Sequence, residues 1–183
     1  MPTIITHSFV GWIASRFLNK PLLPRILILS LILPVLPDLD VISFQFGIPY
    51  EHFWGHRGFT HSLAFAAILG VLTTLLFFGR LGLGWSRMGG LMLYFFLITA
   101  SHGVLDALTR GGLGIAFFSP FDNGRYFFPW RPIKVSPIGL KAFLSGWGAR
   151  TLLSELLWVW LPLTAVLLMV KALLKRRSSA SSG

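Results

Sequence analysis

The chain has 183 residues, of which 54% are hydrophobic and only 12% are charged. A soluble domain carries about 25% charged residues, and one of this length could not bury so much apolar surface. The composition therefore argues against a soluble enzyme, a disordered chain and a nucleic-acid-binding domain, and it predicts an integral membrane protein. In that setting the net charge of +10 fits anionic lipid headgroups and the positive-inside rule.

Apolar stretches follow one another along the chain. Residues 4–18 predict an amphipathic or partly inserted helix, and residues 25–36 form a short apolar run that we expect to end at Pro34 and Pro37. The remaining stretches are long enough to cross a bilayer and cover residues 62–79, 89–108 and 152–170. The pattern predicts an all-α integral membrane bundle with about four membrane-inserted helices.

Residues 1–177 are interpreted as one membrane-embedded domain, and residues 178–183 as a disordered tail. A long loop, residues 109–150, is rich in glycine, proline and aromatic residues and contains Arg125 and Arg131. One interpretation is a lid over a metal site at one membrane face, in which the two arginines bind substrate phosphate. The alternative is an aromatic belt whose arginines extend toward the headgroups.

Ionisable side chains gather at the edges of the apolar stretches, where they are unfavourable and therefore mark candidates for function. His61 precedes one span, His102 and Asp106 lie near the end of the next, and Glu155 opens the last. Because consecutive spans alternate in direction, these residues come to one membrane face.

Two short motifs place histidine and aspartate at ligand spacing. His102 and Asp106 are four residues apart, so a helix puts both on one face, where they bind one metal ion or the carboxylate orients the imidazole. Asp38 and Asp40 follow a proline and could face one cation, although a polar turn or a helix N-cap explains them as well.

The segment His56-Arg57-Gly58-Phe59-Thr60-His61-Ser62 is the most specific local signal. Thr60 predicts an N-cap, which would place His61 in the first turn of the following helix. A helix N-terminus and Arg57 both favour an anion, so the segment combines metal ligands with an anion site, as phosphate-ester hydrolysis requires. The alternative is a basic anchor beside the membrane.

Two further residues are ambiguous from the sequence. His7 is a polar residue within an apolar helix. A lone histidine in such a position is usually a core residue whose hydrogen bonds are satisfied within the protein. Glu155 is either a site residue or the partner of Arg150 or Lys141. Because the chain has no cysteine, a bound metal must be held by histidine and carboxylate, which suits zinc, manganese or iron.

The order of these residues resembles the YdjM-like family of membrane-bound metal-dependent hydrolases. The resemblance is carried by His7, Pro37-Asp38-Leu39-Asp40, the segment from His56 to Ser62, and His102-x3-Asp106. It implies a multi-pass hydrolase of the inner membrane, and some members are described as binding a soluble repressor.

A more distant similarity is to zinc-dependent phospholipase C and P1-type nucleases, which are all-helical enzymes with three zinc ions. It implies as ligands His7, Asp38, one of His56 and His61, His102 and Asp106. It leaves Glu155 as the candidate for a later ligand, although these enzymes use further histidine and glutamate ligands after the His-x3-Asp.

We therefore expect a divalent metal centre with two or more Zn²⁺ ions, or Mn²⁺ in their place. The expected ligands are His7, Asp38, Asp40, His56, His61, His102, Asp106 and Glu155. Asp38 or Asp106 would bridge the ions or act as a base, and Arg57 would bind the substrate phosphate. The expected reaction is hydrolysis of a phosphoester of a phospholipid or a related membrane substrate.

Two rival functions remain open. The first is a non-catalytic, metal-binding membrane scaffold or a partner-binding regulator, for example of a soluble repressor. The second is a metal-ion transporter, which would need ligands near the bilayer midplane. In all cases we expect membrane lipids and no nucleic acid as direct partners. The distribution of basic residues favours a site on the extracytoplasmic face of the inner membrane.

Overall fold

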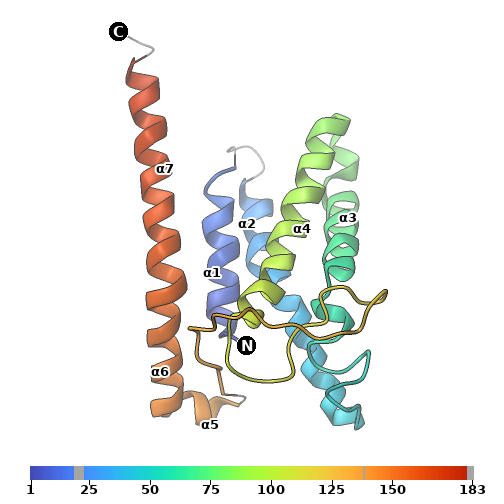
Figure 1. Ribbon diagram of the computed structural model, residues 1–183. Helices are drawn as coiled ribbons and strands as arrows, with labels where there is room; N and C mark the ends of the chain where they lie inside the picture. The colour runs from blue at the N-terminus through green and yellow to red at the C-terminus, as the bar shows by residue number, and fades with distance from the viewer. Residues whose placement is uncertain (19–22, 138, 181–183) are drawn as a thin grey trace.

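The computed structural model describes residues 1–18, 23–137 and 139–180. These residues form helices and connecting segments, and their only β-structure is a pair of isolated bridges. Four helical stretches are long and apolar enough to cross a membrane, namely Pro24–Phe46, Leu63–Leu81, Trp85–Ala107 and Gly146–Arg177. The expected all-α membrane bundle is therefore confirmed (Figure 1).

The first helix is apolar but too short to be one of these spans. Helix α1, Ile4–Ser15, begins where the Thr3 side chain accepts a hydrogen bond from a backbone N–H in the first turn. It packs against α2, Leu23–Ile32, at a point where a Cβ on Gly11 would lie 1.7 Å from the carbonyl oxygen of Ser30. Only glycine allows the two backbones to approach so closely.

The second apolar run does not end at its prolines, contrary to the sequence prediction. A 3-10 helix, η2 (Leu33–Phe46), continues directly from α2. Pro34 lies in the first turn of η2, where a missing N–H leaves no hydrogen bond unmade, and Pro37 is tolerated inside it. Asp38 and Asp40 consequently lie on a helix rather than in a turn.

The next two spans form an antiparallel pair. Helix α3, Leu63–Phe78, is followed by the short 3-10 turn η4, Gly79–Leu81, and then by α4, Trp85–Ala107. Along this pair, a Cβ on Gly70 would lie 2.7 Å from the Met92 carbonyl oxygen. The pair therefore packs through a small residue, as is common between membrane helices.

The start of α3 differs from the prediction. Ser62, and not Thr60, is its N-cap, and the Ser62 hydroxyl accepts a hydrogen bond from the backbone N–H of Phe65. His61 ends the preceding 3-10 turn η3, Phe59–His61. The Thr60 hydroxyl does not cap the helix and donates to Asp40.

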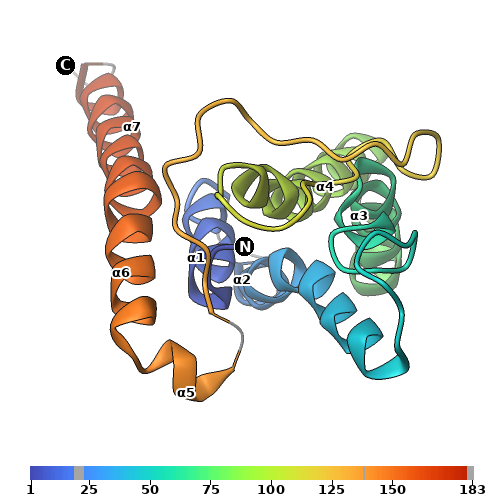
Figure 2. The same ribbon diagram turned by 60° about the horizontal axis from the view of Figure 1, so that its bottom comes forward.

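The chain after α4 crosses the end of the bundle at which α4 finishes (Figure 2). This irregular segment, residues 108–137, is tied to the start of α3 by a hydrogen bond from the Leu63 N–H to the Phe117 carbonyl. The Ala116 N–H also donates to the Arg57 carbonyl. The segment therefore packs on the part of the chain that carries the histidine motif.

The C-terminal part is a short helix followed by one long, interrupted helix that stands to one side of the bundle (Figure 1). Its elements are α5 (Leu140–Phe143), α6 (Gly146–Glu155), the π-helix η5 (Leu156–Trp160) and α7 (Leu161–Ala180). The span thus begins earlier than predicted, at Gly146 and not at residue 152. The predicted tail, residues 178–183, starts inside α7, and residues 181–183 lie outside the described chain.

Candidate metal centre

Most of the predicted ligands lie in one buried cluster where four parts of the chain meet. Helix α1 supplies one residue, η2 supplies two, the segment before α3 supplies two and the end of α4 supplies two. These residues are His7, Asp38, Asp40, His56, His61, His102 and Asp106. Each is at most 8% exposed, which is unusual for so many ionisable groups in one place.

The centre of the cluster is a group of four possible ligands. Asp38, His61, His102 and Asp106 each offer one atom, and these atoms all lie within 4.8 Å of one another. The Nε2 atoms of His61 and His102 are 2.9 Å apart. The Asp38 Oδ1 atom is 3.6 Å from the first of them and 3.4 Å from the second.

The hydrogen bonds at the far side of each imidazole decide what Nε2 can do. The Nδ1 atom of His102 is 2.7 Å from the Pro34 carbonyl oxygen, which can only accept, so Nδ1 carries the proton. In the same way, the Nδ1 atom of His61 is 3.1 Å from a carboxylate oxygen of Asp40. In the neutral rings, both Nε2 atoms are therefore unprotonated, and their lone pairs face each other.

No donor from the described residues fills the space between these atoms in the neutral state. Both carboxylate oxygens of Asp38 and of Asp106 are buried and lack a hydrogen-bond partner, although Asp106 forms an ion pair with Arg57. Buried acceptors of this kind are normally satisfied, and two nitrogen and two oxygen acceptors that converge are what a divalent cation requires. The residues present thus fit a metal ion.

Without a metal, a proton takes the place of the cation. Burial lowers the pKa of His61, but the carboxylates of Asp38 and Asp40 outweigh burial and raise that pKa to about 9. The ring is then protonated at neutral pH and donates to both sides. A divalent ion that binds here displaces this proton.

Asp40 holds the histidine motif in place. Its carboxylate lies 2.6 Å from Nδ1 of His56, accepts from the backbone N–H of Arg57 at 3.1 Å, and accepts from the Thr60 hydroxyl at 2.5 Å. Asp40, His56 and His61 form a second group with metal-ligand spacing. Since the Nδ1 side of His61 already faces Asp40, the carboxylate is best placed to orient this imidazole.

Arg57 lies inside the cluster and not at its rim. Its guanidinium is buried, with Nε 3.0 Å from the Asp106 Oδ2 atom, and it donates to the Gly111 carbonyl and to the Thr109 hydroxyl. Its backbone has a φ of 64°, a conformation that non-glycine residues rarely adopt. The side chain that we expected to bind phosphate is an ion-pair partner of Asp106 and compensates its charge.

His7 extends the cluster on the side of α1. Its ring stacks on His102 with 3.9 Å between the ring centroids, and its Nε2 atom is 3.6 Å from the Asp106 Oδ1 atom. Neither ring nitrogen has a hydrogen-bond partner. A second group of unsatisfied atoms thus lies beside the first, with Asp106 between them.

Glu155 lies apart from this cluster. Its carboxylate accepts hydrogen bonds from the Thr3 N–H, the Thr3 hydroxyl and the Thr6 hydroxyl at 2.5–2.6 Å. These bonds join the C-terminal helix to the start of α1, and they replace the predicted pairing with Arg150 or Lys141.

The two loop arginines also make local contacts. Arg125 donates to the carbonyls of His56 and Tyr50, and so fixes the segment before α3. The Arg131 guanidinium lies over the ring of Phe127, 4.8 Å from its centroid.

One partner in the site was not foreseen from the sequence. In a 3-10 helix the carbonyl of Pro34 would bond the N–H of residue 37, but residue 37 is a proline and has no N–H. The Pro34 carbonyl is therefore open to His102. The Pro-x-x-Pro spacing is the signal that could have predicted this contact.

Comparison with known proteins identifies the family. The fold and site describe a multi-pass helical membrane protein with a buried His/Asp centre, and the sequence model of the YdjM inner membrane protein family matches residues 1–178. The chain belongs to this family and is an inner membrane protein.

A named relative supports the same conclusion. The chain is 43% identical over 165 residues to the inner membrane protein YbcI of Escherichia coli (strain K12). The alignment covers 88% of this chain and 92% of the relative. No solved structure gives a significant match. The more distant similarity to zinc-dependent phospholipase C and P1-type nucleases is not shown by these comparisons.

Proposed function

We propose that this protein is a membrane-bound metal-dependent hydrolase that cleaves a phosphoester of a phospholipid or a related membrane substrate. The observation that carries the proposal is the convergence of two imidazole lone pairs, the unpartnered carboxylate of Asp38 and the Asp106 carboxylate in a buried site. A purely structural polar network would satisfy these atoms internally.

The ligands divide by their surroundings. Asp38, His61, His102 and Asp106 would hold one divalent ion, and their four nitrogen and oxygen atoms suit Zn²⁺, with Mn²⁺ as the alternative. His7 and the second oxygen of Asp106 would contribute to another ion. A divalent ion in such a site polarises a phosphoryl oxygen and lowers the pKa of a water molecule.

The protein residues around the ligands have separate tasks. Asp40 orients the His61 ring, and Arg57 balances the charge of Asp106 and ties it to the loop after α4. Asp38, whose oxygens have no other partner, is the best placed to accept a proton from the attacking water. The site lies at one end of the spans, close to the level of the phosphoester groups of the lipids.

The proposal is tested with metal-loaded protein in vesicles of phosphatidylglycerol and phosphatidylethanolamine, with the lipid products identified by mass spectrometry. We expect Asp38→Asn to abolish product formation. Glu51→Gln, which changes an exposed loop carboxylate, should leave it intact.

Absence of product would count against the hydrolase. If protein with full metal content cleaves neither these lipids nor bis(p-nitrophenyl) phosphate, the hydrolase proposal fails. The non-catalytic, metal-binding scaffold or partner-binding regulator would then be the better description.

A further inference from the structure

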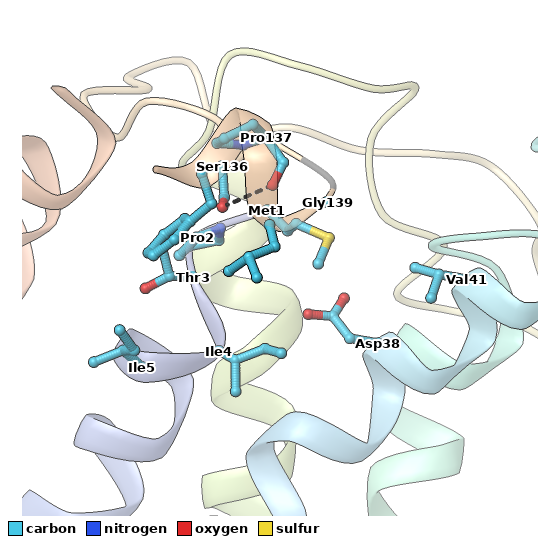
Figure 3. Close-up of a pocket in the computed structure, with 12 residues that line it drawn as sticks. Met1, Pro2, Thr3, Ile4, Ile5, Asp38, Val41, Ser136, Pro137 and Gly139 are labelled. Carbon is cyan, nitrogen blue, oxygen red and sulfur yellow. Dashed lines mark hydrogen bonds between the residues drawn. The ribbon is translucent and has the colours of Figure 1, made fainter. Parts of the chain in front are cut away.

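A cavity opens directly beside the candidate metal centre. Its volume is about 410 Å³, within the range of small-molecule sites. It lies between the start of α1, the 3-10 helix η2, the residues Ser136 and Pro137, and α5 (Figure 3). None of the sequence motifs predicted it, because its walls come from four separate parts of the chain.

The walls of this cavity are almost entirely apolar. Ile4 and Ile5 of α1, Val41 of η2, and Leu140 and Phe143 of α5 contribute hydrocarbon surface. The charged side chain in its lining is Asp38, whose carboxylate is directed toward the residues at the start of α1 in Figure 3. The same carboxylate is a candidate metal ligand, so the cavity and the metal centre share a wall.

The position of the cavity indicates what enters it. Ile4, Ile5 and Leu140 are 57%, 49% and 73% exposed, so the rim is apolar as well as the interior. In a protein of the inner membrane, an apolar rim beside spanning helices meets lipid hydrocarbon. The walls offer a charged headgroup few partners beyond Asp38 and the amino group of Met1, whereas an acyl chain would bury apolar surface along them.

We propose that this cavity binds one acyl chain of a phospholipid and so brings the adjoining phosphoester to the metal centre. The inference rests on the proposed function, and it narrows the substrate to a lipid with a long hydrocarbon chain. The unpartnered Asp38 oxygens mark the polar end of the cavity, where the ester and phosphate groups lie.

Binding is tested without reference to turnover. The metal-loaded protein is placed in vesicles that contain phosphatidylglycerol with a photoactivatable diazirine in one acyl chain, and the cross-linked residues are mapped by mass spectrometry. We expect cross-links at Ile4, Ile5, Val41, Leu140 and Phe143. Val41→Trp, which fills the cavity, should remove them.

The matched control is Ile42→Trp. Ile42 is the next residue of η2, is 54% exposed and does not line the cavity, so this variant should keep the cross-links. A second pair, in α5 and at the residue just after it, covers the case in which a tryptophan beside Asp38 prevents folding or metal binding. Leu140→Trp lies in the cavity wall, and Leu144→Trp lies outside it and is 76% exposed.

The activity of the same variants separates the two proposals. Filling the cavity should reduce cleavage of long-chain phosphatidylglycerol by about tenfold or more and leave bis(p-nitrophenyl) phosphate cleavage unchanged. Equal effects on both substrates, or cross-links that persist in Val41→Trp and Leu140→Trp, would overturn the acyl-chain site. If wild-type protein cleaves neither substrate, the proposed function fails, and the cross-links still decide whether the cavity binds an acyl chain.

Discussion

The imidazoles of His61 and His102 each have one nitrogen held by a fixed acceptor and one directed into the cluster. Asp40 and the Pro34 carbonyl are those acceptors. Outer partners of this kind select the tautomer that leaves the other nitrogen able to bind metal. At the scale of the residue, the centre is thus defined as much by its supports as by its ligands.

Asp40→Asn tests this division. The amide keeps the size of the side chain but removes the charge that orients His61, so the affinity for Zn²⁺ should fall by about 10–100-fold while the fold is retained. Competition with a chromophoric chelator measures the change. Asp122→Asn, in an exposed part of the loop, is the control and should bind as tightly as the unmodified protein.

A loss of all metal in Asp40→Asn would instead make Asp40 a ligand, in agreement with the group that it forms with His56 and His61. The sequence could suggest that Asp38 and Asp40 act together. It could not separate ligand from orienting residue, because that depends on the 3-10 geometry of η2.

The element η2 explains why two prolines stand just before the aspartates. A 3-10 helix of 14 residues is unusually long, and Pro37 leaves the Pro34 carbonyl without its backbone donor. The sequence prediction treated both prolines as helix ends, since proline usually has that effect. The continuation of α2 into η2 depends on packing against α1 and α4, which composition does not reveal.

Pro37→Ala restores an N–H at the position that can bond the Pro34 carbonyl. This N–H would compete with the His102 imidazole, so the ring would lose its fixed tautomer, and we expect a weaker Zn²⁺ affinity by about tenfold. Chelator competition again gives the value. Pro49→Ala, in the exposed loop after η2, serves as the comparison, and equal affinities for the two variants would refute this role of the carbonyl.

Glycine contacts between helices give a prediction of stability. A Cβ on Gly70 would meet backbone atoms of α4 at 2.7 and 2.8 Å, so Gly70→Ala should destabilise the α3–α4 pair by about 1–3 kcal/mol. Gly89, in α4, has open space around it, and Gly89→Ala should be neutral or slightly stabilising.

Thermal unfolding in detergent compares the two variants. A midpoint for Gly70→Ala that equals the midpoint for Gly89→Ala would contradict the close packing of α3 against α4.

For the whole molecule, the alternation of spans was predictable, and so was the gathering of the polar residues at one end. Charge patterning and apolar run lengths fix these features. The path of residues 108–137 and the contacts of Arg57 and Glu155 were not predictable. They depend on long-range hydrogen bonds, such as those that join Glu155 to Thr3.

The same charge patterning predicts the orientation in the membrane. The end of the bundle remote from the candidate centre carries Arg16, Arg25, Arg80, Arg87, Lys171, Lys175, Arg176 and Arg177. At the other end, Arg57 is buried against Asp106, and Arg125 bonds carbonyl oxygens, so both serve the fold. From the positive-inside rule we predict that the C-terminus lies in the cytoplasm and the centre on the extracytoplasmic face.

Reporter fusions after Arg177 test this orientation. We expect a fused fluorescent protein to be bright and a fused alkaline phosphatase to be inactive. A dark fluorescent protein together with an active phosphatase would reverse the assignment and place the centre on the cytoplasmic face.

The metal content of the purified protein shows whether the buried histidines and aspartates form a metal centre. Full-length protein in detergent is incubated with Zn²⁺, freed of excess ion and analysed by mass spectrometry of the metal. We predict at least one equivalent per chain, lost in His102→Ala and in Asp106→Ala, and retained in His52→Ala, where an exposed histidine is removed. A chain that holds no Zn²⁺ or Mn²⁺, or a His102→Ala variant that holds as much as the unmodified protein, would contradict the metal centre.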